Sequence, residues 1–269
     1  MTTIASTVLD ELARHQPPPR SVVLSWLGQS SFALRLGGAT VLIDPFISPH
    51  PDRVVPPPFA AEEAHGVDVL LITHDHLDHL DERAVPVIAA ASPTAIVVVP
   101  EEVVERTVEL GLDPARVRGL PADGHTELGS VAVDAVPAWH GVEIGDAYRP
   151  GPFLGYVVSA GGVRVYHAGD TIVFDGLVER LRELGVQLAL LPINGRDAER
   201  EAKGLVGNMN EQEAAQLARD IGADAVVPMH WDMFPGNPGD PAAFVAAAET
   251  TVIVLQRLRP FVYTAPEAT

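Results

Sequence analysis

Three histidines and an aspartate occur within six positions of this sequence, in the order His74, His76, Asp78 and His79. They follow, after Thr73, residues 67–72, a mostly apolar run that is typical of a buried strand. If the chain leaves this strand extended, His74, His76 and Asp78 point to one side, because side chains alternate along a strand. A helix beginning near His79 would turn that imidazole towards the same point. Imidazoles and a carboxylate that converge are ligands for Zn²⁺ or Mn²⁺, so the motif predicts a metal site.

Further candidate ligands stand where predicted strands end. His140 follows a strand expected at 131–136, Asp170 follows one at 163–167, and His230 follows one at 225–229. Strand ends are where open α/β folds collect functional groups. Each residue alone is weak evidence, but together with the first motif they predict a centre large enough for two ions.

The elements that must position these side chains can be expected from apolar periodicity. The runs at 22–27, 31–36 and 40–44 predict an antiparallel meander, because Gly28 and the pair at 37–38 supply the turns. Further strands are expected at 67–72, 95–99, 131–136, 153–159, 163–167, 187–191, 225–229 and 252–255. Helices are expected at 2–15, 80–91, 101–110, 174–184, 210–221 and 241–249. The helix at 210–221 has a capping box, with Asn210 at the cap and Glu213 three residues later.

Strand-rich segments followed by helix-rich segments occur twice, and no linker separates them. The pattern predicts one α/β domain over residues 1–269, built from a pair of sheets between helices. Its ends would be a short helix at about 2–15 and a tail at about 264–269. His125 is interpreted as a turn residue within it.

Composition narrows the function. The chain has no cysteine, so any metal must be held by histidine and carboxylate, and a reducing cytoplasm is the expected compartment. No signal-peptide pattern or membrane span is recognisable. The formal net charge of -18 and the lack of a basic cluster argue against nucleic-acid and membrane partners. A small-molecule substrate is expected, and the sequence leaves a homo-oligomer open.

The ligand order His74-x-His76-x-Asp78-His79, then His140, Asp170 and His230, resembles that of the metallo-β-lactamase superfamily of hydrolases. Finer motifs are similar to the L-ascorbate-6-phosphate lactonase-like branch: LGYV at 154–157, YHAGDT at 166–171, GNMNE at 207–211 and PMHWDMF at 228–234. The resemblance implies a four-layer αββα sandwich of two mixed sheets flanked by helices. It also implies one or two divalent ions, Mn²⁺ or Zn²⁺, although Fe²⁺ accepts the same ligand types.

Carried over by position, the resemblance implies that one ion is held by His74, His76 and His140. The second would be held by Asp78, His79 and His230, with Asp170 bridging both. Asp78 and Asp170 would be the catalytic carboxylates, with Asp78 facing a metal-bound hydroxide. The implied activity is hydrolysis of a lactone or a small ester, which could carry a phosphate.

Other residues are weaker candidates. Asp44, at a predicted strand end, could accept the N–H of a ligating histidine and fix its tautomer, or could cap a turn. Arg196 could bind a substrate phosphate, but interleaved acidic residues also fit a solvated loop. Asn208 is a candidate through the GNMNE motif. The alternatives are a phosphodiesterase or nuclease of the same superfamily, an oxidoreductase with bound iron, or a non-hydrolytic metal-binding relative.

Overall fold

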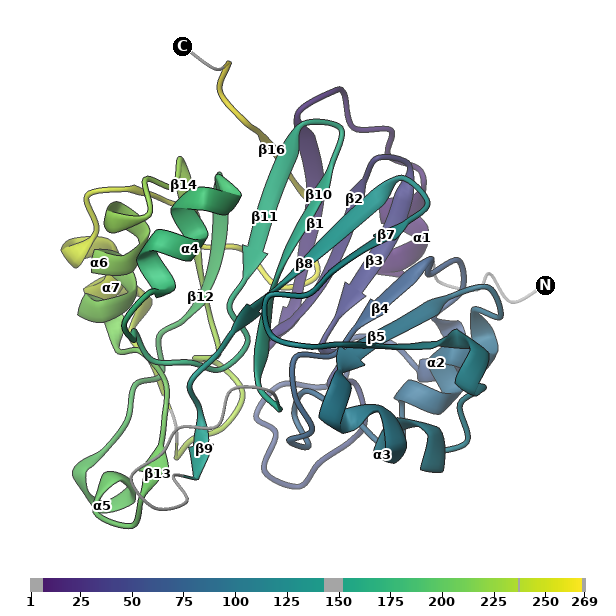
Figure 1. Cartoon of the computed structure of the whole chain (residues 1–269), viewed down its shortest axis with the longest axis horizontal. Coiled ribbons are helices and arrows are strands. Elements are labelled where there is room, and N and C mark those ends of the chain that lie inside the picture. The colour runs from purple at the N-terminus through teal and green to yellow at the C-terminus, as the bar shows by residue number, and fades with distance from the viewer. Residues whose placement is uncertain (1–6, 143–151, 237, 268–269) are drawn as a thin grey trace.

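The computed structural model describes residues 7–142, 152–236 and 238–267. Its centre is a pair of seven-stranded sheets (Figure 1). The first sheet has the order β16-β1-β2-β3-β4-β5-β6. Its strands are β1 (Ser21–Gly28), β2 (Ser31–Leu36), β3 (Ala39–Ile43), β4 (Val69–Leu71), β5 (Ile96–Pro100), β6 (Val117–Leu120) and β16 (Phe261–Thr264). The expected meander is confirmed, since β1, β2 and β3 pair antiparallel.

The second sheet has the order β15-β14-β12-β11-β10-β8-β7. Its strands are β7 (His125–Leu128), β8 (Val131–Pro137), β10 (Leu154–Ala160), β11 (Val163–His167), β12 (Leu188–Pro192), β14 (Ala225–Met229) and β15 (Thr251–Val252). Strands β11, β12 and β14 are parallel, and β8 shares their direction because β10 runs antiparallel to both β8 and β11. In the first sheet, β3 to β6 pair parallel, so both sheets are mixed.

Helices cover the two outer faces (Figure 1). The first sheet is covered by α1 (Val8–Ala13), α2 (Val85–Ala91) and α3 (Val104–Glu109), and the second by α4 (Leu177–Leu184), α6 (Glu211–Asp220) and α7 (Pro241–Ala247). Short 3₁₀ turns lie at Ala61–Glu63, Glu101–Val103 and Pro114–Arg116. This is the expected four-layer αββα sandwich. No helix among the described residues is long and apolar enough to span a membrane.

Alternation along the strands explains the layers. In β3, Val41 and Ile43 face the core between the sheets, whereas Leu42 packs in the separate core under α1 and α2. In β5, Val98 faces the inner core while Val97 and Val99 face the helices. Strands buried on both faces are expected to be continuously apolar.

The prediction that a helix begins near His79 is wrong. The chain after His79 forms turns, and α2 begins only at Val85. Pro86 explains the difference: it lacks an N–H and fits the first helical turn, whereas a helix begun at residue 80 would place it in the interior. The carboxylate of Asp81 accepts the backbone N–H groups of Ile47, Ser48 and Ala84, which fixes the intervening turn.

The edge strands β6, β7 and β16 were not among the strands expected from the sequence. His125 lies in β7 rather than in a turn, and its strand is short and polar because one side faces solvent. Strand β16 pairs with β1, from Ser21 opposite Thr264 to Leu24 opposite Phe261. Of the expected N-terminal helix at 2–15, the structure shows α1, and residues 1–6 lie outside the described residues.

Candidate metal centre

All the predicted ligands lie at one end of the sandwich. His74 continues from β4, His140 follows β8, Asp170 follows β11 and His230 follows β14. In the second sheet these are carboxyl ends of strands with a common direction, so they meet at one edge. The hydrogen bond from Leu154 N to Thr73 O, 3.0 Å long, joins this edge to the end of the first sheet.

The first candidate group consists of His74, His76 and His140. One ring nitrogen from each lies within 4.8 Å of the others. His74 Nε2 is 3.0 Å from His76 Nδ1, and the His140 ring centroid is 5.4 Å from that of His74. The Nδ1 atom of His140 faces the carbonyl oxygen of Gly207 at 3.1 Å, which leaves Nε2 directed to the centre.

A two-stranded pairing explains how Gly207 reaches His140. Strand β9 (Gly141–Val142) pairs antiparallel with β13 (Leu205–Val206), so the segment after His140 lies beside the segment before Gly207. Together with α5 (Ala198–Glu201), these short elements project beyond the sandwich in Figure 1.

The second candidate group consists of Asp78, His79 and His230, whose ligating atoms also lie within 4.8 Å of one another. His230 Nε2 is 3.3 Å from Asp78 Oδ2, and His79 Nε2 is 3.8 Å from the same oxygen. His230 has a positive φ of 61°, an uncommon conformation for a residue with a side chain. Such strain is typical of functional sites.

Asp170 lies between the two groups. Its Oδ2 atom is 3.5 Å from His140 Nε2 and 3.2 Å from His230 Nε2, and its Oδ1 atom is 3.3 Å from His79 Nε2. The carboxylate thus faces His140 of the first group and two members of the second, and its ligand atom also lies within 4.8 Å of those of His74 and His79. This is the placement that a bridging ligand requires.

Gly169 makes that placement sterically accessible. It has a φ of 60°, and an added Cβ would lie 2.8 Å from Leu154 O and 2.9 Å from Thr73 Cβ. The turn that carries Asp170 therefore packs directly against the end of the first sheet, in a backbone conformation that favours glycine.

Asp44 fixes the orientation of His79. Its Oδ2 atom is 2.7 Å from His79 Nδ1 and accepts the hydroxyl of Thr73 at 2.7 Å, while Oδ1 accepts Thr73 N at 2.8 Å. Asp44 is fully buried. Because its carboxylate accepts from Nδ1, the Nε2 atom of His79 is the one presented to the centre.

The charges of the site are unevenly distributed. Burial lowers the pKa of His74 well below its usual value and also lowers the pKa of His140, which favours the neutral form that a metal ligand requires. Burial alone would lower the pKa of His230, but the carboxylates of Asp170 and Asp78 raise it to about 10. Asp170, despite its burial, has a pKa well below its usual value because His230 and His79 face it.

The donor set fits a divalent cation. The Nε2 atom of His79 and the Oδ1 atom of Asp170 are buried and have no hydrogen-bond partner, although they face each other. Buried polar atoms are normally satisfied, and a cation bound by both would satisfy them. Nitrogen and carboxylate oxygen ligands suit Zn²⁺, Mn²⁺ and Fe²⁺ alike.

The two weaker substrate candidates are placed differently. Arg196 gives both terminal nitrogens to Glu213 at 2.6 Å and its Nε atom to Glu201 at 2.9 Å, so its charge is already balanced. Asn208 is buried beside Gly207, donates to Asn194 Oδ1 at 3.0 Å, and has an Oδ1 atom without a hydrogen-bond partner.

Two residues at the centre were not anticipated. Gln29 lies in the turn between β1 and β2 and contacts Asp78 and His230. Phe153 packs over the first group, with its ring centroid 5.3 Å from that of His74 and 5.6 Å from that of His140. In the sequence, Gln29 shows only as a turn residue and Phe153 only as a strand residue, so neither had a chemical signal.

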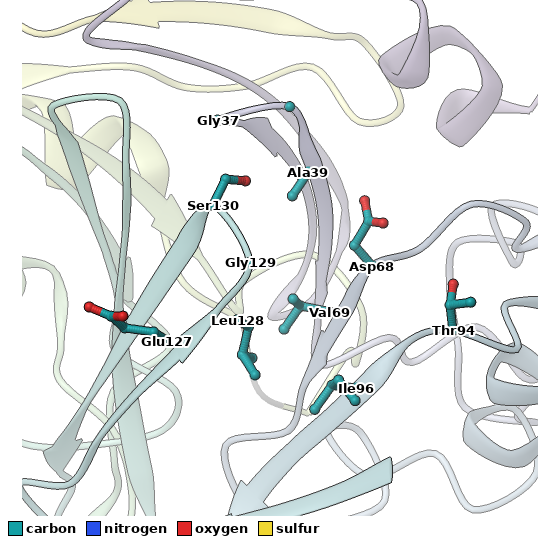
Figure 2. A pocket seen from close by; sticks show the side chains of 11 residues that line it. Gly37, Ala39, Asp68, Val69, Thr94, Ile96, Glu127, Leu128, Gly129 and Ser130 are labelled. Carbon is teal, nitrogen blue, oxygen red and sulfur yellow. The ribbon is translucent and has the colours of Figure 1, made fainter.

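A separate cavity of about 460 Å³ lies at the opposite end of the sandwich, where β4 and β5 begin (Figure 2). It is lined on one side by Asp68, Val69 and Ile96 and on the other by the turn between β7 and β8. None of the seven described ligand candidates lines this cavity.

Comparisons with known proteins identify the family of the chain and agree with its fold. Residues 39–231 match the family model described as the beta-lactamase superfamily domain. A UPF0173 metal-dependent hydrolase of Rubrobacter xylanophilus is 36% identical over 228 residues, covering 82% of this chain and 86% of the relative. A second, of Thermococcus onnurineus, is 34% identical over 239 residues, covering 87% and 96%. The structure of a metallo hydrolase from Ignicoccus hospitalis matches with a TM-score of 0.73 and 25% identity, covering 91% and 100%.

Proposed function

Since the chain belongs to the β-lactamase superfamily of metal-dependent hydrolases, we propose that it hydrolyses a lactone or a related small carboxylic ester. The observation that carries this proposal is the convergence of seven histidine and aspartate side chains, two of which have buried atoms without hydrogen-bond partners. The expected superfamily is confirmed by the family match, while the lactonase-like branch remains part of the proposal.

The proposed ligands form two sets. His74, His76 and His140 would hold one divalent ion, Asp78, His79 and His230 would hold a second, and Asp170 would contribute to both. When bound, such ions supply Lewis acidity and lower the pKa of water towards neutrality.

Asp78 is the proposed proton acceptor. Burial would raise its pKa, but His79 and His230 outweigh that effect and hold the pKa below its usual range. At neutral pH it is therefore ionised. Its place in the second group, rather than its basicity, would let it accept a proton from an attacking water molecule and return that proton to the leaving alcohol oxygen. Its side chain is 20% exposed, so it stays accessible from the mouth of the site.

Apolar side chains beside the first group support a small organic substrate. Phe153 packs over the rings of His74 and His76, and Leu77 is 48% exposed within the metal-binding loop. Apolar surface of this kind can contact the carbon skeleton of a lactone.

The basic residues Arg196 and Lys203 are not free to bind a substrate phosphate. Arg196 is engaged by Glu213 and Glu201, and Lys203 donates to Glu199 at 2.8 Å. A phosphate that bound Arg196 would have to displace two carboxylates. We therefore propose an ester carbonyl as the reacting group and assign Arg196 no contact with substrate.

The test is an assay of protein reconstituted separately with Mn²⁺ and with Zn²⁺. Three substrates are compared: an unphosphorylated lactone, L-ascorbate 6-phosphate and a phosphodiester. We expect turnover of the unphosphorylated lactone, lost in His76→Ala and retained in His65→Ala, an exposed histidine that serves as the control. Cleavage of the diester alone, or no lactone turnover with either metal, would contradict the proposal.

A further inference from the structure

Gln29 occupies an unusual position between the two sheets. It lies in the turn that joins β1 to β2, its side chain is buried, and its φ is 52°. Its backbone N–H donates to Asp232 Oδ1 at 2.9 Å, and its carbonyl oxygen accepts His230 N at 3.1 Å and Trp26 Nε1 at 2.9 Å. These bonds fix the turn against the segment that carries His230.

The side chain of Gln29 reaches two members of the second group. Its Nε2 atom donates to Asp78 Oδ2 at 2.7 Å and lies 3.1 Å from His230 Nε2. The same Nε2 atom lies 3.3 Å from His230 Nδ1, so it contacts both nitrogens of that ring. The hydrogen bond orients the Asp78 carboxylate, and the contact restrains the His230 ring while leaving its Nε2 atom available to an ion. The two partners are far apart in sequence and come from different sheets.

Asp78 needs such a support more than the other ligands of its group. Its neighbours in the loop, Asp75, His76 and Leu77, are exposed, whereas His79 is buried and fixed by Asp44. The first group has supports of its own: the Gly207 carbonyl for His140 and Thr73 Oγ1, 3.1 Å from His74 Nδ1. Gln29 therefore acts on one group and not on the other.

We propose that Gln29 is a positioning residue that sets the affinity of the second group, Asp78, His79 and His230, for its divalent ion. This inference rests on the proposed function, because it requires that this group holds an ion. The amide orients the carboxylate and the imidazole before the ion arrives, so less freedom is lost on binding. Residues that orient metal ligands typically contribute a factor of about 10 to 100 in metal affinity.

The test is a calorimetric titration of metal-free protein with Zn²⁺, comparing wild type with Gln29→Met. Methionine preserves the length and volume of the buried side chain and removes the amide donor. We expect two ions per chain in wild type and, in Gln29→Met, a loss of roughly 10- to 100-fold in one affinity with the other unchanged. His76→Ala and His230→Ala identify which affinity belongs to which group.

Gln256→Met is the matched control, because Gln256 is an exposed glutamine. It should titrate as wild type does. Retention of both wild-type affinities by Gln29→Met, or an equal loss of both, would overturn the positioning role while leaving the metal centre intact. A wild-type chain that binds no ion at the second group would overturn the two-ion centre and this inference together. Far-UV circular dichroism of each variant distinguishes lost positioning from lost folding.

Discussion

Asp44 connects the candidate metal centre to the backbone at the end of β4. Its two oxygens receive Thr73 N, Thr73 Oγ1 and His79 Nδ1, all without exposure to solvent. A carboxylate with three bonds holds both the end of β4 and one metal-binding ring. Its substitution should therefore affect stability and metal binding together.

Asp44→Ala should lower the free energy of unfolding by at least ~2 kcal/mol, because it leaves buried donors without an acceptor. It should also lower metal affinity roughly 10- to 100-fold, because His79 loses the partner that orients it. Urea denaturation and metal analysis after dialysis provide the two measurements.

Asp68→Ala is the control for this prediction. Asp68 is exposed, and its carboxylate accepts a single backbone bond, from Thr40 N at 2.8 Å, at the far end of the same sheet. Water can replace that acceptor, so the free energy of unfolding should fall by less than ~1 kcal/mol and the metal content should not change. Equal effects of the two substitutions would show that Asp44 has no special role.

At the scale of elements, the turns after the strands determine where the ligands lie. Gly169 in the turn after β11 and Gly161 in the turn between β10 and β11 have nearly the same φ, 60° and 58°. Around Gly161 an added Cβ meets nothing within 4 Å, whereas at Gly169 it meets Leu154 O at 2.8 Å. Comparing alanine substitutions at the two glycines therefore distinguishes the effect of backbone strain from the effect of steric contact.

Gly161→Ala should lower the free energy of unfolding by about 1 kcal/mol, the penalty for placing a residue with a Cβ in a left-handed conformation. Gly169→Ala should lower the free energy of unfolding further. It should also lower metal content, because relieving the clash with Leu154 O displaces Asp170. Thermal denaturation and metal analysis of both variants test this. If both variants lose the same stability and keep their metal, the turn at Gly169 does not position the centre.

The first turn of α6 is held by a contact between Arg196 and Glu213. Glu213 caps the helix through Asn210 and also receives both terminal nitrogens of Arg196. Lysine cannot reproduce this two-point contact. Arg196→Lys should therefore lower stability by about 1 kcal/mol and leave the ratio of KM values for phosphorylated and unphosphorylated lactones unchanged.

Lys203→Met, which removes one exposed ion pair with Glu199, is the comparison and should change stability by less than ~0.5 kcal/mol. A KM that rises in Arg196→Lys for the phosphorylated substrate alone would assign Arg196 to phosphate binding after all.

Features of the fold and the site could be predicted from the sequence where the residues involved are close together in the chain. The four residues of the motif at 74–79 and the three strand-end ligands followed from spacing and from strand patterns. Gln29 did not, because its partners Asp78 and His230 are 49 and 201 residues away in sequence. Strand β16 was missed for the same reason, since its partner β1 lies at the other end of the chain. Only tertiary packing reveals contacts of this kind.

At the scale of the whole molecule, the centre lies at the junction of the two sheets. Tyr156 of the second sheet donates to Ile72 O at 2.8 Å, and His167 Nε2 donates to Ser30 O at 2.7 Å. His167 also accepts Gly169 N through Nδ1 at 3.1 Å, so both of its ring nitrogens are engaged in structure rather than in metal binding. Because the proposed ligands come from both sheets, an ion bound by them would couple metal binding to global unfolding.

Metal should therefore stabilise the folded chain. At a free ion concentration of about 100 times Kd, linkage adds about 2.7 kcal/mol, which for a chain of this size raises Tm by roughly 5–10 °C. Calorimetric scans with and without a chelator provide the measurement. A variant carrying both His74→Ala and His230→Ala should show no shift, and a shift of wild-type size in that variant would place the stabilising ion elsewhere.

The most direct measurement of the central claim is anomalous diffraction from crystals grown with Zn²⁺ and measured at the zinc absorption edge. The structure predicts two peaks, one among His74, His76 and His140 and one among Asp78, His79 and His230, with Asp170 between them. A single peak in the first group would contradict the second ion. No peak at any of these seven residues would contradict the metal centre itself.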